Sequence, residues 1–106
     1  MTEVDVELIV SNVCNLHIML LYHQTRSVHI AYPRMIAMFM LKKHLNVPNH
    51  IIGRRFSLTH GTVNNALTRV SNLLLTNDKF WAPKIHKINL LIEQHDSTNK
   101  LSTPSP

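Results

Sequence analysis

The apolar residues between positions 63 and 74 recur at intervals of three and four. They are Val63, Ala66, Leu67, Val70, Leu73 and Leu74. This spacing puts them along one face of a helix that packs on a core. Residues 8–21 and 36–41 repeat the spacing, and no segment sustains the apolar–polar alternation of a half-buried strand. The sequence therefore predicts an all-α fold.

Interruptions of the spacing divide the chain into five or six helices. Helices are predicted over residues 4–22, 33 to about 45, 51–56, about 60–76 and 83 to about 94. Pro33 and Pro83 suit the first turns of two of them. The last helix is expected to bury an apolar set that includes two aromatic residues before it: Phe80, Trp81, Ile85, Ile88, Leu90, Leu91 and Ile92. Residues 1–95 should form one domain, and residues 96–106 a disordered polar tail.

The middle of the chain carries most of its positive charge. Ten of the eleven Lys and Arg lie between residues 26 and 87, where Asp78 is the one acidic residue, so this window has a formal charge of +9. A concentrated basic region is typical of a protein that binds a polyanion such as nucleic acid. The alternative is a basic surface that serves only solubility.

Several classes of function are not expected. Cys14 is the single cysteine, so no internal disulfide forms, and its apolar neighbours favour a packed thiol. The two glycines are too few for a phosphate-binding loop, and no signal peptide or membrane span is visible. The eight His show no metal-ligand spacing. We expect no enzyme activity, no cofactor and no metal.

Residues 51–75 have the layout of a helix–turn–helix: a short helix, a turn at 57–59 and a long helix. Ser57 or Thr59 can cap the long helix. Its polar residues gather near its start, opposite the apolar face: His60, Gly61, Asn64, Asn65 and Thr68. In this motif the start of the second helix enters the major groove, where such side chains meet base edges.

Two stretches, "TRSVHIAYPRMIAMFMLKK" and "IIGRRFSLTHGTVNNALTRV", resemble the C-terminal DNA-binding domain of the bacterial replication initiator DnaA. The residues that carry the resemblance are Ala31, Arg34, Ala37, Met38, Ile52, Gly53, His60, Thr62 and Val63. The resemblance covers roughly residues 8–92. It implies an all-helical, Trp-repressor-like fold that binds double-stranded DNA, in a bacterial or phage protein located in the cytoplasm on the nucleoid.

The resemblance also implies roles for individual residues. Arg26 falls on a basic loop that enters the minor groove, and Arg34 falls on an arginine that contacts the DNA backbone. His60 and Thr62 fall on base-contacting positions, and Asn65 replaces a second histidine. With the neighbouring polar and basic residues, the predicted DNA-binding set is Arg26, Arg34, Lys42, Arg54, Arg55, Thr59, His60, Thr62, Asn64, Asn65 and Arg69.

This sequence departs from the family pattern at the recognition helix. Thr59 stands where the family has an acidic residue, Gly61 where it has a hydroxyl residue, and the turn is one residue shorter. We expect a DNA site different from that of the initiator. No ATPase domain fits before Val10, so a stand-alone regulator of replication or transcription is expected, binding the initiator or forming a homodimer. The alternative is a protein-interaction module of the same fold.

Overall fold

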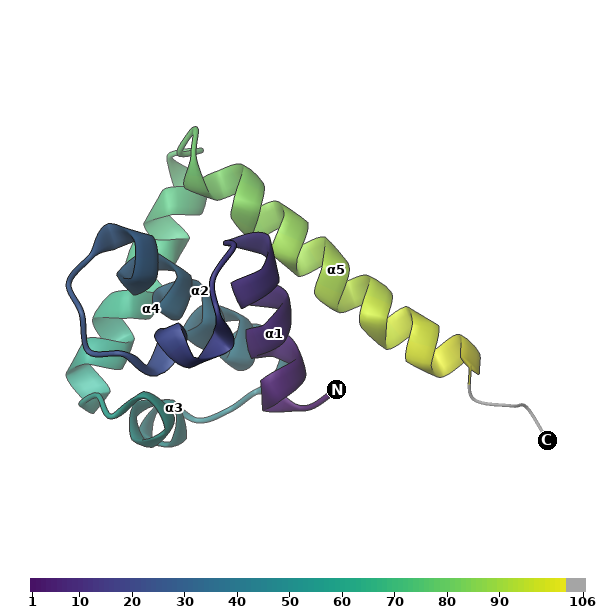
Figure 1. Ribbon diagram of the computed structural model, residues 1–106, viewed down its shortest axis with the longest axis horizontal. Coiled ribbons are helices and arrows are strands. Elements are labelled where there is room, and N and C mark those ends of the chain that lie inside the picture. The colour runs from purple at the N-terminus through teal and green to yellow at the C-terminus, as the bar shows by residue number, and fades with distance from the viewer. Residues whose placement is uncertain (103–106) are drawn as a thin grey trace.

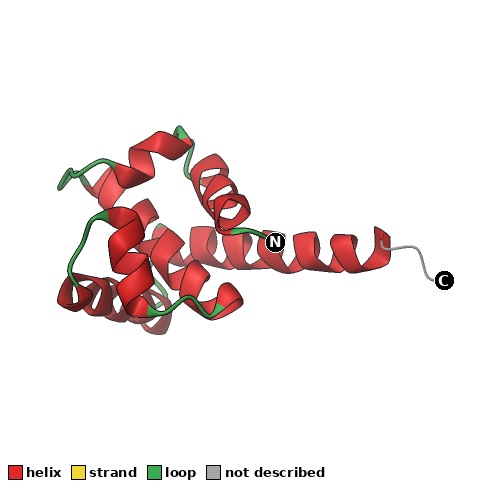
Figure 2. Cartoon of the chain, turned by 90° about the horizontal axis from the view of Figure 1, so that it is seen from below, coloured by secondary structure: helices red, strands yellow, loops and turns green. Residues whose placement is uncertain are grey.

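The computed structural model describes residues 1–102, with side chains described as far as His95. The described residues form six helical elements and no strands: α1 (Glu3–Val13), the 3₁₀ helix η1 (Ile18–Tyr22), α2 (Val28–Leu45), α3 (Asn49–Phe56), α4 (His60–Leu75) and α5 (Trp81–Ser102). The predicted all-α fold is confirmed. Figure 1 shows α1 to α4 packed as one body, from which α5 extends as a rod; Figure 2 shows the same rod from below.

Helix α2 lies at the centre of the core and packs against α1, η1, α3 and α4. Its fully buried residues are Ile36, Ala37, Met38, Met40 and Leu41. Helix α4 turns Val63, Ala66 and Val70 toward them, as the spacing predicted. Burial of these side chains is the main driving force for placing α4, because apolar area removed from water stabilises by roughly 25 cal/mol per Å².

The predicted helix over residues 4–22 is wrong, because it is two elements. Helix α1 begins with a capping box between Thr2 and Asp5 and ends at Val13. Asn15 adopts the left-handed conformation (φ 56°), which an α-helix cannot continue. The His17 side chain then accepts a bond from the Met19 backbone and starts η1. The apolar spacing persists through this break, which is why the spacing alone hid it.

The sequence predicted that Pro33 begins the second helix, and this prediction is wrong. The helix begins five residues earlier, at Val28, and Pro33 lies inside it. The carbonyl of Ser27 accepts bonds from the backbone N–H groups of Ile30 and Ala31, which establishes the first turn before the proline. The predicted end at Leu45 is confirmed, and Asn46 stops the helix in the left-handed conformation (φ 54°).

Helix α5 is longer than predicted and buries fewer apolar residues. It starts at Trp81, after the Asp78 carboxylate accepts bonds from the Phe80 and Trp81 backbones. Ile85, Ile88 and Ile92 are buried, but Leu90 (53% exposed) and Phe80 (57% exposed) are not.

The end of α5 also differs from the prediction near residue 94. The helix continues to Ser102. Residues 96–102, which the sequence placed in a disordered tail, therefore belong to α5. Residues 103–106 lie outside the described residues. Among the described residues, no helix is both long and apolar enough to cross a membrane.

The helix–turn–helix is confirmed as α3, a turn at residues 57–59, and α4. Ser57 takes the left-handed conformation (φ 57°), and the Leu58 N–H donates to the Gly53 carbonyl at 2.8 Å. Thr59 caps α4 by accepting from the Thr62 backbone N–H. This tight turn leaves no room at Gly53: a Cβ there would lie 2.6 Å from the Leu58 carbonyl oxygen.

The two glycines are therefore predicted to respond in opposite ways to alanine. Gly53→Ala forces the turn apart and should lower the free energy of unfolding by about 1–3 kcal/mol. Gly61→Ala, whose Cβ would meet nothing within 4 Å, should raise it by up to about 1 kcal/mol through helix propensity. Urea denaturation followed by circular dichroism measures both. Equal destabilisation by the two variants would contradict this account of the turn.

Candidate nucleic-acid interface

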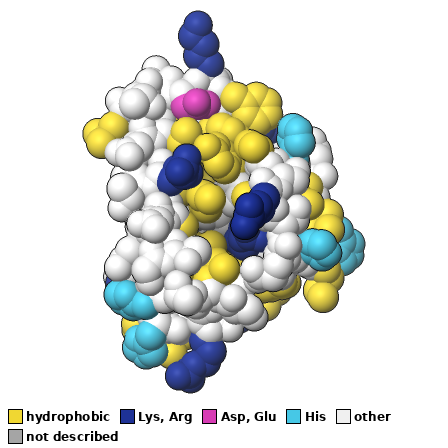
Figure 3. Space-filling model, turned by 90° about the vertical axis from the view of Figure 1, so that its left-hand side faces the viewer, with side chains coloured by type: hydrophobic (Ala, Val, Ile, Leu, Met, Phe, Trp, Pro, Cys, Tyr) yellow, Lys and Arg dark blue, Asp and Glu magenta, His cyan; other side chains and the backbone are white. Residues whose placement is uncertain are grey.

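The outward face of α4 is a continuous polar surface at the helix start. His60, Gly61, Asn64, Asn65 and Arg69 are all exposed, while Val63 and Ala66 hold the opposite face in the core. Figure 3 shows the side of the molecule on which this helix start and the loop before α2 lie. Lys, Arg and His side chains are scattered over this face, which has little acidic surface. The helix N-terminus adds the positive end of its dipole.

The two asparagines of α4 differ in their freedom to bind. The Asn64 amide oxygen accepts a bond from the Asn49 side chain at 2.6 Å, and its amide nitrogen lies 3.4 Å from His60 Nδ1. Asn65 is exposed, and its side chain makes no hydrogen bond among the described residues. Bidentate binding of adenine requires both a free amide oxygen and a free amide nitrogen. Asn65 meets that requirement with both amide groups unbonded, whereas the amide oxygen of Asn64 already accepts one bond from Asn49, which restricts its orientation.

Thr59 and Thr62 are joined to each other at the cap. Their hydroxyl oxygens lie 2.9 Å apart, and the Thr59 oxygen also accepts from the Thr62 backbone at 3.2 Å. Both side chains are exposed. A hydroxyl has one donor and two acceptor positions, so each keeps capacity for a further bond. The cap therefore holds these two hydroxyls in place at the start of α4.

Arg26 lies in the loop of residues 23–27, between η1 and α2, and is exposed. The loop is tied to the helix–turn–helix, because the Gln24 amide donates to the Phe56 carbonyl at 2.9 Å. Phe56 is the last residue of α3. This bond brings the loop that carries Arg26 to the end of α3, where the turn before α4 begins.

Arg34 is placed differently from Arg26. It is only 8% exposed, and its guanidinium donates to the backbone carbonyls of His23 and of Thr25, the latter at 3.2 Å. Burial lowers the pKa of this guanidinium, which nevertheless remains charged at neutral pH. The predicted contact of Arg34 with the DNA backbone remains a prediction, and the structure adds an internal bonding role.

Arg55 is half-buried and pairs with carboxylates of α1. Its guanidinium donates to both carboxylate oxygens of Glu7, at 2.6 and 2.7 Å, and lies 2.9 Å from the Glu3 carboxylate. Glu7 is completely buried and also accepts a bond from the Tyr22 hydroxyl. The bond to Glu7 holds the pKa of Arg55 above its usual range. The sequence predicted a DNA contact for Arg55, and that contact is untested; the observed partners are carboxylates of α1.

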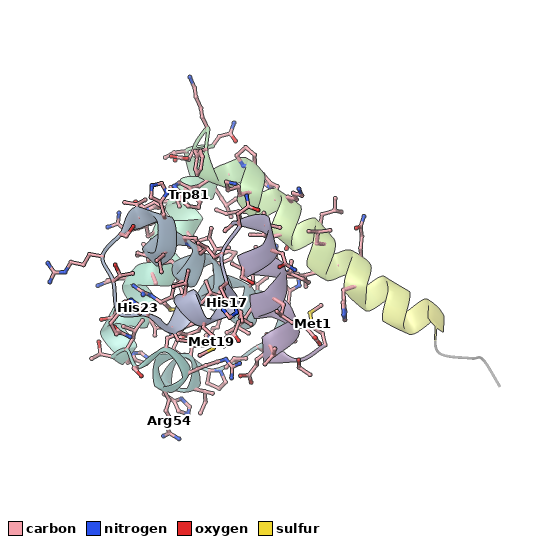
Figure 4. The ribbon with its side chains drawn as sticks, in the orientation of Figure 1. Met1, His17, Met19, His23, Arg54 and Trp81 are labelled. Carbon is pink, nitrogen blue, oxygen red and sulfur yellow. The ribbon has the colours of Figure 1, made fainter. Side chains whose placement is uncertain are left out.

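The remaining predicted cations are exposed. Arg54 lies on α3 and points away from the body in Figure 4, and Arg69 lies on α4, where it donates to the Tyr32 hydroxyl at 3.4 Å. Lys42 is exposed near the end of α2, and no hydrogen bond or ion pair of the described residues ties it to the others. The structure therefore brings Arg26, Arg54 and Arg69 to the helix–turn–helix and leaves Lys42 unattached to it.

Sequence reasoning missed three residues that support this surface. Gln24 ties the loop to α3, Asn49 holds Asn64, and Glu7 neutralises Arg55. Each acts on a residue at least 15 positions away, so no local pattern identifies it. The nearest signal was Glu7, an acid among apolar residues of a helix, which is a position where a buried charge needs a partner.

Among the described side chains, no group of three or more His, Cys, Asp and Glu could hold a metal ion. Cys14 is half-buried, and burial raises the pKa of its thiol. A raised thiol pKa disfavours the reactive thiolate.

A comparison with protein families matches residues 5–70 to the bacterial DnaA protein helix-turn-helix. The chain belongs to this family. The match covers α1 through most of α4, which includes the loop with Arg26 and the start of the recognition helix. The family is a DNA-binding domain rather than a catalytic one. No curated protein matches the chain significantly.

The neighbouring arginines of α3 should have separable effects. Arg55→Ala leaves the buried Glu7 without its cationic partner and should lower the free energy of unfolding by roughly 3 kcal/mol. Arg54→Ala removes an exposed cation and should change stability by no more than about 0.5 kcal/mol. Urea denaturation of both variants gives the comparison. A stable Arg55→Ala protein would show that the pair with Glu7 is dispensable.

Tyr22 should make stability fall at high pH. Burial and the bond to Glu7 raise the pKa of Tyr22 to about 12, above the value of about 10 in an unfolded chain. A raised pKa means that this contribution is complete below pH 10 and is lost as the pH rises toward 12. Stability should therefore drop more steeply between pH 10 and 12 in the native protein than in Tyr22→Phe. Parallel curves for the two proteins would refute the bond to Glu7.

Proposed function

We propose that this protein binds double-stranded DNA, with the start of α4 in the major groove and Arg26 in the adjacent minor groove. The observation that carries the proposal is the exposed hydrogen-bonding face of α4 beside the loop that bears Arg26. The first turns of a recognition helix are the part that reaches base edges. Family membership supports the same partner.

Within this proposal each side chain has a defined task. Asn65 reads a base through its free amide, and His60 donates to or accepts from a base edge. Thr59 and Thr62 bond near the helix N-terminus, where free N–H groups also favour a phosphate. Arg54 and Arg69 are exposed and contribute phosphate contacts, which supply affinity without sequence information.

The biological role we propose is regulation of replication or of transcription by occupancy of DNA sites, in the cytoplasm on the nucleoid. Binding at or near sites of a replication initiator would let the protein compete with the initiator or recruit it. A homodimer would double the number of base contacts. A single helix–turn–helix offers few such contacts, so either arrangement raises affinity by linking two binding events.

A second candidate is a protein-interaction module that has lost sequence reading. It is favoured by Gly61, which offers no side chain at an exposed position of the recognition helix. A partner protein would then contact the surface that DNA uses in the first proposal. The two candidates differ in salt dependence, because DNA binding releases counterions with a slope of about −0.9 per phosphate neutralised.

Selection from a random duplex library at two salt concentrations tests the proposal. We expect the retained duplexes to share one motif, and His60→Ala and Asn65→Ala each to weaken binding to it by about 1–3 kcal/mol. Asn64→Ala is the matched control, since its amide is already bonded to Asn49 and should matter less. Titration of the selected duplex measures all three.

The other outcomes are equally informative. Salt-sensitive retention without a shared motif would leave a non-specific DNA-binding protein and refute sequence reading by α4. Absence of retention at low salt would overturn DNA binding and support the protein-interaction module. A larger loss for Asn64→Ala than for Asn65→Ala would reverse the assignment of the two amides.

A further inference from the structure

The loop that carries Arg26 is attached to the helices at two points, once through a side chain of α2 and once through its own Gln24. Arg34 of α2 donates to the carbonyls of His23 and Thr25, and Gln24 donates to the carbonyl of Phe56 in α3. We propose that Arg34 and Gln24 are positioning residues that set the place of Arg26 relative to α4, and that Arg34 acts through this loop rather than by contacting a phosphate. This inference rests on the proposed DNA binding.

The burial of Arg34 supports a positioning role. The residue is 8% exposed and lies in an open pocket of about 160 Å³ between α2 and α4, which Thr62, Asn65 and Arg69 also line. Its Nη1 and Nη2 groups are used by the loop. A cation that reaches a phosphate from the surface needs exposed donors, whereas Arg34 is buried and one N–H of each Nη group is directed at a backbone oxygen of the loop. Arg34 thus joins the loop to the helix on which α4 packs.

Gln24 supplies the second attachment. The Phe56 carbonyl belongs to the last turn of α3, where helix carbonyls lack a partner within the helix. Gln24 satisfies it and so fixes the loop to the helix before the turn. The two attachments reach both sides of the helix–turn–helix: α2, which packs on α4, and α3, which precedes it.

Arg26 is therefore the free residue between fixed neighbours. Thr25 is held by Arg34 and by its own N–H bond to the His23 carbonyl, and the Ser27 N–H donates to the Thr25 hydroxyl. Ser27 is also the N-cap of α2. A side chain on an ordered backbone loses less entropy when it binds than one on a loose loop. The attachments thus raise affinity without touching DNA.

A double-mutant cycle with Arg26→Ala tests the proposal. If Gln24 and Arg34 act through Arg26, then Gln24→Ala and Arg34→Gln should each weaken binding to the selected duplex by about three- to tenfold. Neither should weaken it further when Arg26 is already alanine. His23→Ala is the matched control, because only the backbone of His23 takes part, and it should leave affinity unchanged at pH 8.

Salt dependence in the Arg26→Ala background separates the two roles of Arg34. A positioning residue leaves the slope of log Kd against log salt equal to that of Arg26→Ala alone. A phosphate contact would lower the slope by about 0.9 in addition, which would overturn the proposal. Additive losses in the double variants would overturn it as well.

Hydrogen exchange tests the attachments without DNA. Exchange of the Thr25 and Ser27 amides should rise about tenfold in Gln24→Ala and in Arg34→Gln, while α4 amides stay protected and both variants keep the native circular dichroism spectrum. Unchanged loop exchange would refute the positioning role. Faster exchange in a protein that binds no duplex would instead sink the proposed function while leaving the loop attachment intact.

Discussion

The buried carboxylate of Glu7 sets the arrangement on which the rest of the structure depends. A charge with no exposed surface must be paired, and Glu7 receives two bonds from Arg55 and one from Tyr22. These partners belong to α3 and η1. One side chain of α1 therefore fixes both the first helix of the helix–turn–helix and the segment that leads into the loop with Arg26. The Tyr22 ring stacks on Phe56, 5.5 Å between centroids, and closes the same contact.

This arrangement reduces the number of cations between residues 26 and 87 that are available to a polyanion. The formal charge of +9 treats every cation as equally available, but Arg55 is paired with α1 and Arg34 is bonded to backbone. The exposed cations nearest the recognition helix are Arg26, Arg54 and Arg69. Attraction of a polyanion toward that face thus comes from a small set of charges, helped by the helix dipole.

Local patterns allowed the helix–turn–helix to be predicted, because the apolar spacing of α4, the Thr59 cap and the turn all lie within about twenty residues. The breaks at Asn15 and the early start of α2 were missed, since left-handed asparagines and backbone capping leave little trace in hydrophobic spacing. Exposed Leu90 was missed because an apolar residue on a helix says nothing of whether another element covers it.

The candidate site was predictable only in part, for a related reason. His60 and Asn65 could be predicted as site residues because they lie at the start of a predicted helix. Arg34 and Arg55 look like surface cations in sequence, and what distinguishes them are carbonyls and carboxylates 9 to 48 residues away. The roles of Gln24 and Asn49 likewise depend on contacts that exist only once the helices have packed.

The open space around Gly61 separates two properties that are usually linked in a recognition helix. A Cβ added there would meet no atom within 4 Å, so packing against the rest of the protein does not require glycine at this position. In the proposed DNA complex, a substitution at this position would change contacts with DNA while the core, the cap and the turn stay as they are. Under that proposal, the DNA site could change through this one position without a compensating gain of stability elsewhere.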